Sequence, residues 1–144
     1  MKTVAQLLRD KQHQKVHTIS SRAAVLELLQ AMAEHNVGAM PVVDNDELVG
    51  IVSERDYARK VVLKGRSSVG TPVSAIMSSP VTTTEPQQSV QACMSLMTDR
   101  HLRHLPVVDE GRLVGLLSIG DLVKEAIAEQ ADLIQQLERY IRGE

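Results

Sequence analysis

The sequence contains neither phenylalanine nor tryptophan, and tyrosine occurs only twice. A buried core must therefore be built from aliphatic side chains and methionine, in a chain that is 43% hydrophobic. The single cysteine, Cys93, excludes an internal disulfide. No apolar run approaches the roughly 20 residues of a transmembrane helix, and segment 1–15 lacks the apolar stretch of a signal peptide. These absences predict a cytoplasmic protein with no membrane partner.

An excess of charge of one sign is also lacking, because 16 basic residues are balanced by 18 acidic ones. We therefore expect no nucleic-acid partner. Neither a glycine-rich phosphate loop nor a Ser–His–Asp triad is recognisable, so an enzyme is not expected. His101 and His104 span a helix end and a strand start with no Cys or carboxylate at ligand spacing, so we predict no metal site.

The dominant feature that is present is an internal repeat. Residues 37–56 read VGAMPVVDNDELVGIVSERD, and residues 102–121 read LRHLPVVDEGRLVGLLSIGD. The two strings align without a gap, so that Pro41 returns as Pro106. A unit of about sixty residues is too small to bury a secure core alone, and the two copies should therefore pack together around a pseudo-twofold axis.

Each copy shows the same order of expected elements: strand, helix, strand, strand, helix. The predicted fold class is α/β (α+β), with two pseudo-symmetric β-α-β-β-α motifs that each form a small mixed sheet and pack through their sheets. The expected parts are an N-terminal helix and lead-in at 1–15, motif 1 at 16–64, a linker at 65–75, motif 2 at 76–126 and a C-terminal helix extension at 127–144.

Turn-forming and helix-capping residues indicate the boundaries of these elements. Strands are expected at 16–19, 39–43 and 48–52 of the first copy and at 81–84, 104–108 and 113–117 of the second. The Ser20–Ser21 pair is expected to cap the first repeat helix, and Gly38 is expected to end it in the left-handed conformation.

The C-terminal extension carries an apolar stripe on a segment rich in Glu, Gln and Arg. Its members are Ile127, Ala131, Ile134, Leu137 and Ile141. The helix either lies on its own domain or contacts a second copy of the chain. We favour the dimer contact, because the first copy has no counterpart against which the stripe would pack.

The repeated Ser-x-x-Asp at the end of the last strand of each copy admits two interpretations. It is close to a capping box, in which Ser and Asp only stabilise the start of a helix. It also lies at the carboxyl end of a strand and at a helix N-terminus, where ligands and phosphates collect. A carboxylate there suits a ribose diol, because it accepts two hydroxyl hydrogen bonds.

The string hydrophobic-Pro-Val-Val-Asp, followed by Leu-Val-Gly-hydrophobic-hydrophobic-Ser-x-x-Asp, resembles a tandem pair of CBS domains, the Bateman module. The resemblance covers about Val16 to Ala126, and the strings SERDYARKV and SIGDLVK look like small stand-alone bacterial CBS-pair proteins. It implies a homodimeric regulatory module that binds an adenine nucleotide (AMP, ADP, ATP or NAD(H)) in two clefts, changes shape and signals to an unknown downstream protein.

Carried over from the family, the first cleft takes its ribose and phosphate contacts from the second copy. These residues are Ser118, Asp121, Arg103 and His104. The adenine wall would come from the first copy and its lead-in: Val16, Thr18, Gly38, Ala39, Met40 and Pro41.

The second cleft implied by the resemblance uses Ser53, Arg55 and Asp56 for ribose and phosphate. Its adenine wall would be Ile76, Met77, Val81, Thr83, Leu105 and Pro106. Lys60, one turn along the helix, either reaches a phosphate or belongs to a solvated face. Because Gly38-Ala39 stand where the second copy has Arg103-His104, the two clefts are expected to differ.

Three functions remain open from the sequence. The favoured one is a nucleotide-sensing binding module without catalytic activity. An interaction adaptor without ligand, acting through exposed terminal helices, is the alternative. A nucleotide hydrolase is least favoured, because no catalytic group is recognisable.

Overall fold

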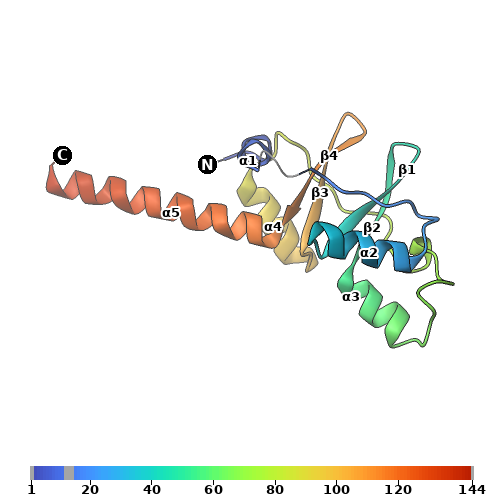
Figure 1. Cartoon of the computed structure of the whole chain (residues 1–144). Helices are drawn as coiled ribbons and strands as arrows, with labels where there is room; N and C mark the ends of the chain where they lie inside the picture. The colour runs from blue at the N-terminus through green and yellow to red at the C-terminus, as the bar shows by residue number, and fades with distance from the viewer. Residues whose placement is uncertain (1, 12–14, 144) are drawn as a thin grey trace.

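The computed structural model describes residues 2–11 and 15–143. These residues form two similar halves and a long C-terminal helix (Figure 1). The elements in chain order are α1 (Val4–Asp10), α2 (Val25–His35), β1 (Ala39–Asp44), β2 (Glu47–Ser53), α3 (Glu54–Tyr57), the π-helix η1 (Ala58–Val62), the 3-10 helix η2 (Val73–Ala75), α4 (Val90–Arg100), β3 (His104–Asp109), β4 (Arg112–Ser118) and α5 (Ile119–Arg142). The predicted α+β class is confirmed.

Each half contains one antiparallel hairpin, β1–β2 in the first copy and β3–β4 in the second. Their registers coincide, since Pro41 pairs with Ile51 and Pro106 pairs with Leu116. The β1–β2 turn needs a left-handed backbone, which Asn45 adopts with a φ of 50°. Asn and Asp tolerate this conformation, and the turn residues therefore specify the hairpin.

The outer strands expected at 16–19 and 81–84 are shorter than predicted. In the first copy, only Ile19 forms a bridge, donating to the carbonyl of Pro41 at 3.1 Å. In the second, Thr84 donates to the carbonyl of Pro106 at 3.0 Å. Both bridges are parallel but isolated, so each sheet consists of two antiparallel strands and not of the small mixed sheet that was expected.

The serine pair expected to cap α2 does not do so. Ser21 donates through both its hydroxyl and its N–H to the carboxylate of Asp44 instead. The residue before α2 is Ala24, which makes no side-chain cap. The helix ends at Asn36, whose left-handed φ of 54° replaces the one expected at Gly38.

Each half is completed by the segment that precedes the other half in sequence. α1 packs into the core of the second copy, where the Val4 N–H donates to the Gln88 carbonyl at 2.8 Å. η2 packs into the core of the first copy, where the Val73 N–H donates to the Ala23 carbonyl at 2.8 Å. The strings TVAQLL and PVSAIM are therefore equivalent docking segments that cross between the copies.

Two aliphatic cores result from this exchange. The first-copy core consists of Val25, Leu28, Met32, Met40, Val42, Val52, Val61, Val73 and Ile76. The second-copy core consists of Val4, Leu7, Val90, Cys93, Met97, Leu105, Val107, Leu117 and Leu122. The two halves contact each other through β2 and β4.

Two glycines allow the crossing segments to approach the hairpins. A Cβ at Gly115 would lie 2.6 Å from a methyl carbon of Leu8, which belongs to α1. A Cβ at Gly50 would lie 2.5 Å from the sulfur of Met77, just beyond η2. Both distances are far below van der Waals contact, so the repeated glycine of Leu-Val-Gly provides space for the lead-in of the other copy.

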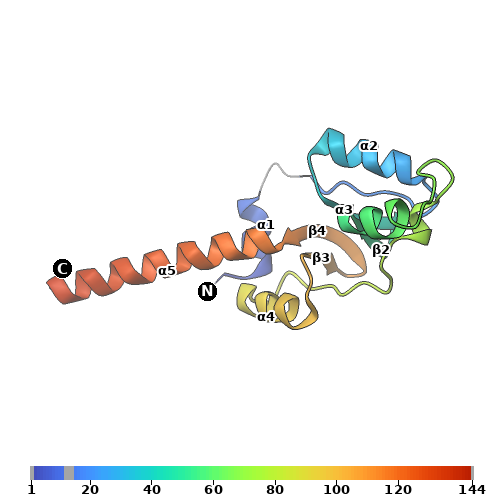
Figure 2. The same ribbon diagram turned by 90° about the horizontal axis from the view of Figure 1, so that it is seen from below.

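The C-terminal helix α5 leaves the body of the protein (Figures 1 and 2). Leu122 anchors its first turn in the second-copy core, whereas every residue from 130 to 143 is exposed. That part of α5 therefore does not lie on its own domain. Among the described residues, no helix combines the length and the apolar character that crossing a bilayer requires.

We expect Gly115→Ala to lower the free energy of unfolding by about 1–3 kcal/mol, because the new methyl group overpacks against Leu8. Gly70→Ala is the matched control, since its Cβ would meet only Ser67 at 3.7 Å, an ordinary contact. Chemical denaturation of both variants tests the close approach. Equal stability of the two variants would contradict it.

Candidate functional site

Both Ser-x-x-Asp sequences form the capping boxes that their spacing predicts. At α3, the Asp56 N–H donates to Ser53 Oγ at 3.2 Å and the Ser53 N–H donates to Asp56 Oδ2 at 2.9 Å. At α5, the same two bonds join Asp121 and Ser118 at 3.1 and 2.8 Å. The structural role and a ligand role are compatible, because each box fixes a carboxylate at a helix N-terminus.

A cavity of about 560 Å³ lies between the two copies beside Asp56. Its size falls within the roughly 300–1,000 Å³ typical of ligand pockets. The lining residues are Gly38, Ala39, Ile51, Val52, Ser53, Glu54, Arg55, Asp56, Ser78, His101, Leu102, Arg103 and His104. Both copies contribute, so the site requires the assembled pair.

The charged groups of this cavity suit a ligand with a diol and an anionic group. Arg55 and Arg103 are exposed and come from different copies. The Asp56 carboxylate accepts hydrogen bonds, whereas the two guanidinium groups recognise phosphate by charge and geometry. Glu54 adds a second carboxylate at the rim.

Lys60 does not line the cavity but supports it. Its Nζ donates to the Ile76 carbonyl at 3.0 Å and lies 3.4 Å from Asp56 Oδ1. The lysine therefore ties the start of the first-copy helix to the crossing segment. The side chain is 42% exposed, and the phosphate contact expected from the sequence stays a prediction.

The cavity combines residues that the sequence divided between two clefts. Arg103 and His104, which were expected beside Asp121, line the cavity of Asp56. His104 also pairs with Ser118 across the β3–β4 hairpin, and its pKa responds to the charge of Asp121. Gly38 and Ala39 were also expected with Asp121 and lie in the same cavity. The first residues of β1 and β3, Ala39 and His104, lie at the space between the copies. Both therefore line the same cavity.

Other expected wall residues do not reach this cavity. Met40, Ile76 and Leu105 are fully buried within the two cores, since they occupy inward positions. Pro41 and Pro106 are buried as well, and Met77 packs beside the first-copy core. Thr18 is exposed outside the cavity, and Val81 and Thr83 line a separate groove of about 480 Å³ with Val49 and Val108.

The region of Asp121 differs from that of Asp56. Asp121 Oδ2 receives Lys11 Nζ at 2.7 Å, and the same ammonium donates to the Leu116 carbonyl at 3.2 Å. The adjacent pocket, which Lys11, Val16 and Ala39 help to line, measures only about 160 Å³. Sequence reasoning missed Lys11 because it lies outside the repeat and 110 positions from its partner.

Burial and neighbouring charges shift the pKa values of Asp121 and His104. Burial alone would raise the pKa of the Asp121 carboxyl, but the Lys11 and Ser118 hydrogen bonds hold it below its usual range. Burial lowers the pKa of His104, assisted by Arg103 and Lys11 and opposed by Asp121. The neutral imidazole is therefore favoured at neutral pH, and Arg103 remains the cation of this strand end.

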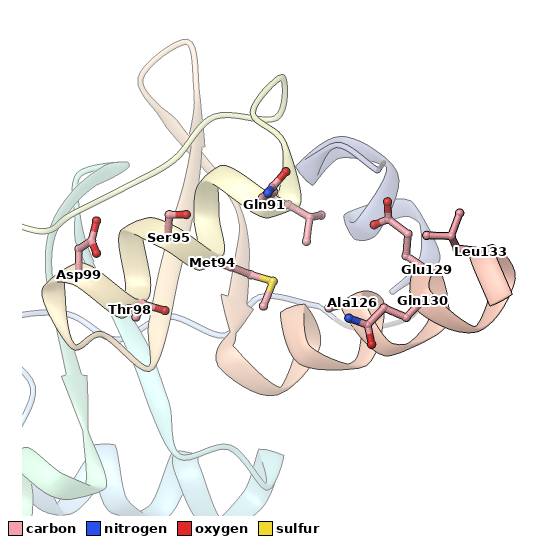
Figure 3. Close-up of a pocket in the computed structure, with 10 residues that line it drawn as sticks. Gln91, Met94, Ser95, Thr98, Asp99, Ala126, Glu129, Gln130 and Leu133 are labelled. Atoms are coloured by element: carbon pink, nitrogen blue, oxygen red, sulfur yellow. The ribbon is translucent and has the colours of Figure 1, made fainter.

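A second groove, of about 550 Å³, lies between α4 and α5 (Figure 3). Met94 projects from α4 toward α5, and Leu133 closes the far end. The charged residues that line it, Asp99 and Glu129, are both acidic. Because carboxylates repel phosphate, this groove is not the candidate nucleotide site.

Cys93 is the single cysteine of the chain. Cys93 is buried in the second-copy core, where burial raises the pKa of its thiol and Thr84 Oγ1 lies 3.3 Å from its sulfur. In the described part of the chain, no group of three or more His, Cys, Asp or Glu residues is placed to hold a metal ion.

Comparison with known sequences agrees with the repeat. The family model of the CBS domain matches residues 4–63 and 73–128. The mitochondrial CBS domain-containing protein CBSX3 of Arabidopsis thaliana is 41% identical over 124 residues. The match covers 83% of this chain and 60% of that protein, so the chain spans less than two thirds of this relative.

Solved structures show the same fold. A CBS-domain protein from Burkholderia ambifaria MC40-6 is 50% identical, with a TM-score of 0.84 and coverage of 90% of this chain and 96% of that one. The CBS domain pair of protein MJ0100, solved with 5′-methylthioadenosine and S-adenosyl-L-methionine, is 22% identical and has a TM-score of 0.77. That alignment covers 90% of this chain and 98% of MJ0100, and it supports the fold alone.

The lowered pKa of His104 predicts a pH dependence of stability. The unfolded imidazole titrates near its ordinary value of about 6.5, so the unfolded chain binds the proton more readily than the folded one. The neutral His104 imidazole therefore contributes fully to the free energy of unfolding above about pH 6.5. This contribution is lost as the pH falls through the pKa of His104 in the folded protein.

We expect His104→Asn to reduce this loss of unfolding free energy between pH 7 and about pH 5. The matched control is His101→Asn, at an exposed position whose left-handed φ of 55° suits Asn. Denaturant titrations at several pH values measure the slope for each protein. A slope in the His104 variant equal to that of the wild type would contradict the assignment.

Proposed function

Because this chain belongs to the CBS-domain family and carries two such domains in tandem, we propose that it is a regulatory module that binds an adenine nucleotide between them. The observation that carries the proposal is the cavity beside Asp56, which draws on both copies and combines two carboxylates, Asp56 and Glu54, with two arginines. No catalytic step is part of the proposal. Binding of the ligand in the cavity is itself the regulatory signal.

Each part of the cavity corresponds to one part of a nucleotide. Asp56 would accept the hydrogen bonds of the ribose hydroxyls from its fixed position at the start of α3. Arg55 and Arg103 would bind the phosphate from opposite copies. The base would lie along the backbone of Gly38 and Ala39, beside the side chain of Ile51.

The proposed ligand class is AMP, ADP, ATP or NAD(H). All share the adenosine moiety, and the MJ0100 pair of the same fold binds two adenosyl compounds. The two arginines favour ligands with phosphate over neutral adenosyl compounds.

Signalling follows from the position of the cavity. A nucleotide held by Arg55 of one copy and Arg103 of the other would favour one relative placement of the two halves. The halves contact each other through β2 and β4, and α5 continues directly from β4. A change in the angle between halves would therefore move α5 and any protein bound to it.

We also propose that α5 mediates a homodimer. Val123, Ile127, Ile134, Leu137 and Ile141 occupy one seam, with exposures from 43% to 81%. Their spacing, with Gln130 between, alternates four and three residues, so Ile falls at successive a positions and Leu at a d position of a heptad. This pattern is typical of parallel two-stranded coiled coils, so a second α5 is the fitting partner.

An interaction adaptor remains the second candidate function, and one observation favours it. The same exposed seam on α5 can bind an amphipathic helix of another protein. A monomer in solution that also binds no nucleotide would favour this adaptor over the regulatory module.

We expect Asp56→Asn to weaken nucleotide affinity by about tenfold to a hundredfold, since a hydrogen bond to a charged group contributes roughly 1.5–3 kcal/mol. Isothermal calorimetry with AMP, ADP, ATP and NAD measures the effect. Asp109→Asn, an exposed position at the end of β3, is the matched control. Unchanged affinity for every nucleotide in the Asp56 variant would refute the ribose assignment.

We expect the wild-type protein to be a dimer and Ile134→Asp to make it a monomer, because a carboxylate in the seam would lose hydration without gaining a partner. Gln136→Asp places the same residue on the opposite face of α5 and should leave the dimer intact. Light scattering after gel filtration measures the molar mass. A monomeric wild type, or a dimeric Ile134 variant, would exclude the coiled coil.

A further inference from the structure

The equivalent carboxylates of the two halves, Asp56 and Asp121, have different charged partners. Asp121 receives the Lys11 ammonium across the fold at 2.7 Å, and both side chains are largely buried, with exposures of 21% and 24%. Asp56 has a looser partner at 3.4 Å, Lys60, which belongs to its own helix segment. The carboxylate of the second copy is therefore bound by a group that comes from outside the repeat.

The sequence explains why this contact occurs on one side only. Glu125 stands at the position equivalent to Lys60, so the second copy has no lysine of its own beside Asp121. In the crossing segments, TVAQLL aligns with PVSAIM, and the same alignment places Pro80 opposite Lys11. Proline has no cation to offer, so no equivalent of Lys11 reaches Asp56.

The pocket lined by Asp56 and the pocket lined by Lys11, the partner of Asp121, also differ in size. The cavity at Asp56 measures about 560 Å³ and lies within the range of ligand pockets. The pocket that Lys11 lines measures about 160 Å³, below the roughly 300 Å³ at which such pockets begin. A nucleotide entering there would have to displace the ammonium, which donates to both Asp121 and the Leu116 carbonyl.

We propose that Lys11 closes the cleft of Asp121, so that each chain binds one adenine nucleotide, at the Asp56 cavity. This inference rests on the proposed function and adds its stoichiometry. Lys11 thereby acts as the residue that decides which of two pseudo-symmetric clefts accepts a ligand. Without it, the Asp121 carboxylate would be available to a ribose diol, as Asp56 is.

A purely structural Lys11, which only fastens α1 to the second copy, makes a different prediction. Its removal would lower the melting temperature and leave the number of bound nucleotides unchanged. The decisive measurement is therefore stoichiometry by isothermal calorimetry, with the melting temperature recorded in parallel. AMP, ADP, ATP and NAD are used as probes on the full-length chain.

The expected result is one nucleotide per chain for the wild type and for Lys11→Arg, which preserves the cation. Lys11→Ala should bind two, and the double variant Lys11→Ala/Asp121→Ala should bind one again. Lys11→Met, which keeps the length of the side chain and removes the charge, replaces Lys11→Ala if the latter does not fold. Lys124→Ala, an exposed lysine on α5, is the control and should bind one.

Other outcomes separate the two proposals. Two nucleotides per wild-type chain, or one in both Lys11→Ala and Lys11→Met, would overturn the role of Lys11 and leave the proposed function intact. One nucleotide per wild-type chain that is lost in Asp121→Ala and retained in Asp56→Ala would also overturn it. No binding of any probe by the wild type or by either uncharged Lys11 variant would overturn both proposals.

Discussion

The exchange of lead-in segments is the contact on which the rest of the structure depends. Leu8 packs on Gly115 and Met77 packs on Gly50, so that each hairpin receives the segment that precedes the other. A half of about sixty residues buries too little surface to be stable alone, and neither core is complete without the crossing segment. The cavity between the halves is thus a product of the same packing that makes them one unit.

The pseudo-symmetry holds for the backbone and fails for the charges. Both capping boxes have nearly identical geometry, because Ser and Asp recur at the same positions of equal hairpins. The surrounding cations do not recur, since Lys11 belongs to the lead-in alone. The two copies therefore have equivalent backbones and capping boxes. Residues outside the repeated string give the two carboxylates different charged neighbours.

The repeat, the hairpins and the N-termini of α3 and α5 were predictable, because turn residues and capping spacing act over a few residues. Contacts between distant segments were not, since nothing in the string around Lys11 indicates a partner in α5. The burial of the Met40 and Leu105 side chains was not predictable for a related reason, because it depends on how the hairpins pack in each half. For Asp56 and Arg55, the resemblance to the family supplied what local pattern could not.

The crossing arrangement also bears on synthesis of the chain. During synthesis, η2 follows directly after the first copy. Val73 can therefore bind the Ala23 carbonyl soon after the first copy has been made. The opposite holds for α1, which is made well before Gln88 and the core around Leu122 that it needs. During that interval, the apolar face of α1 has no native partner and is exposed to aggregation.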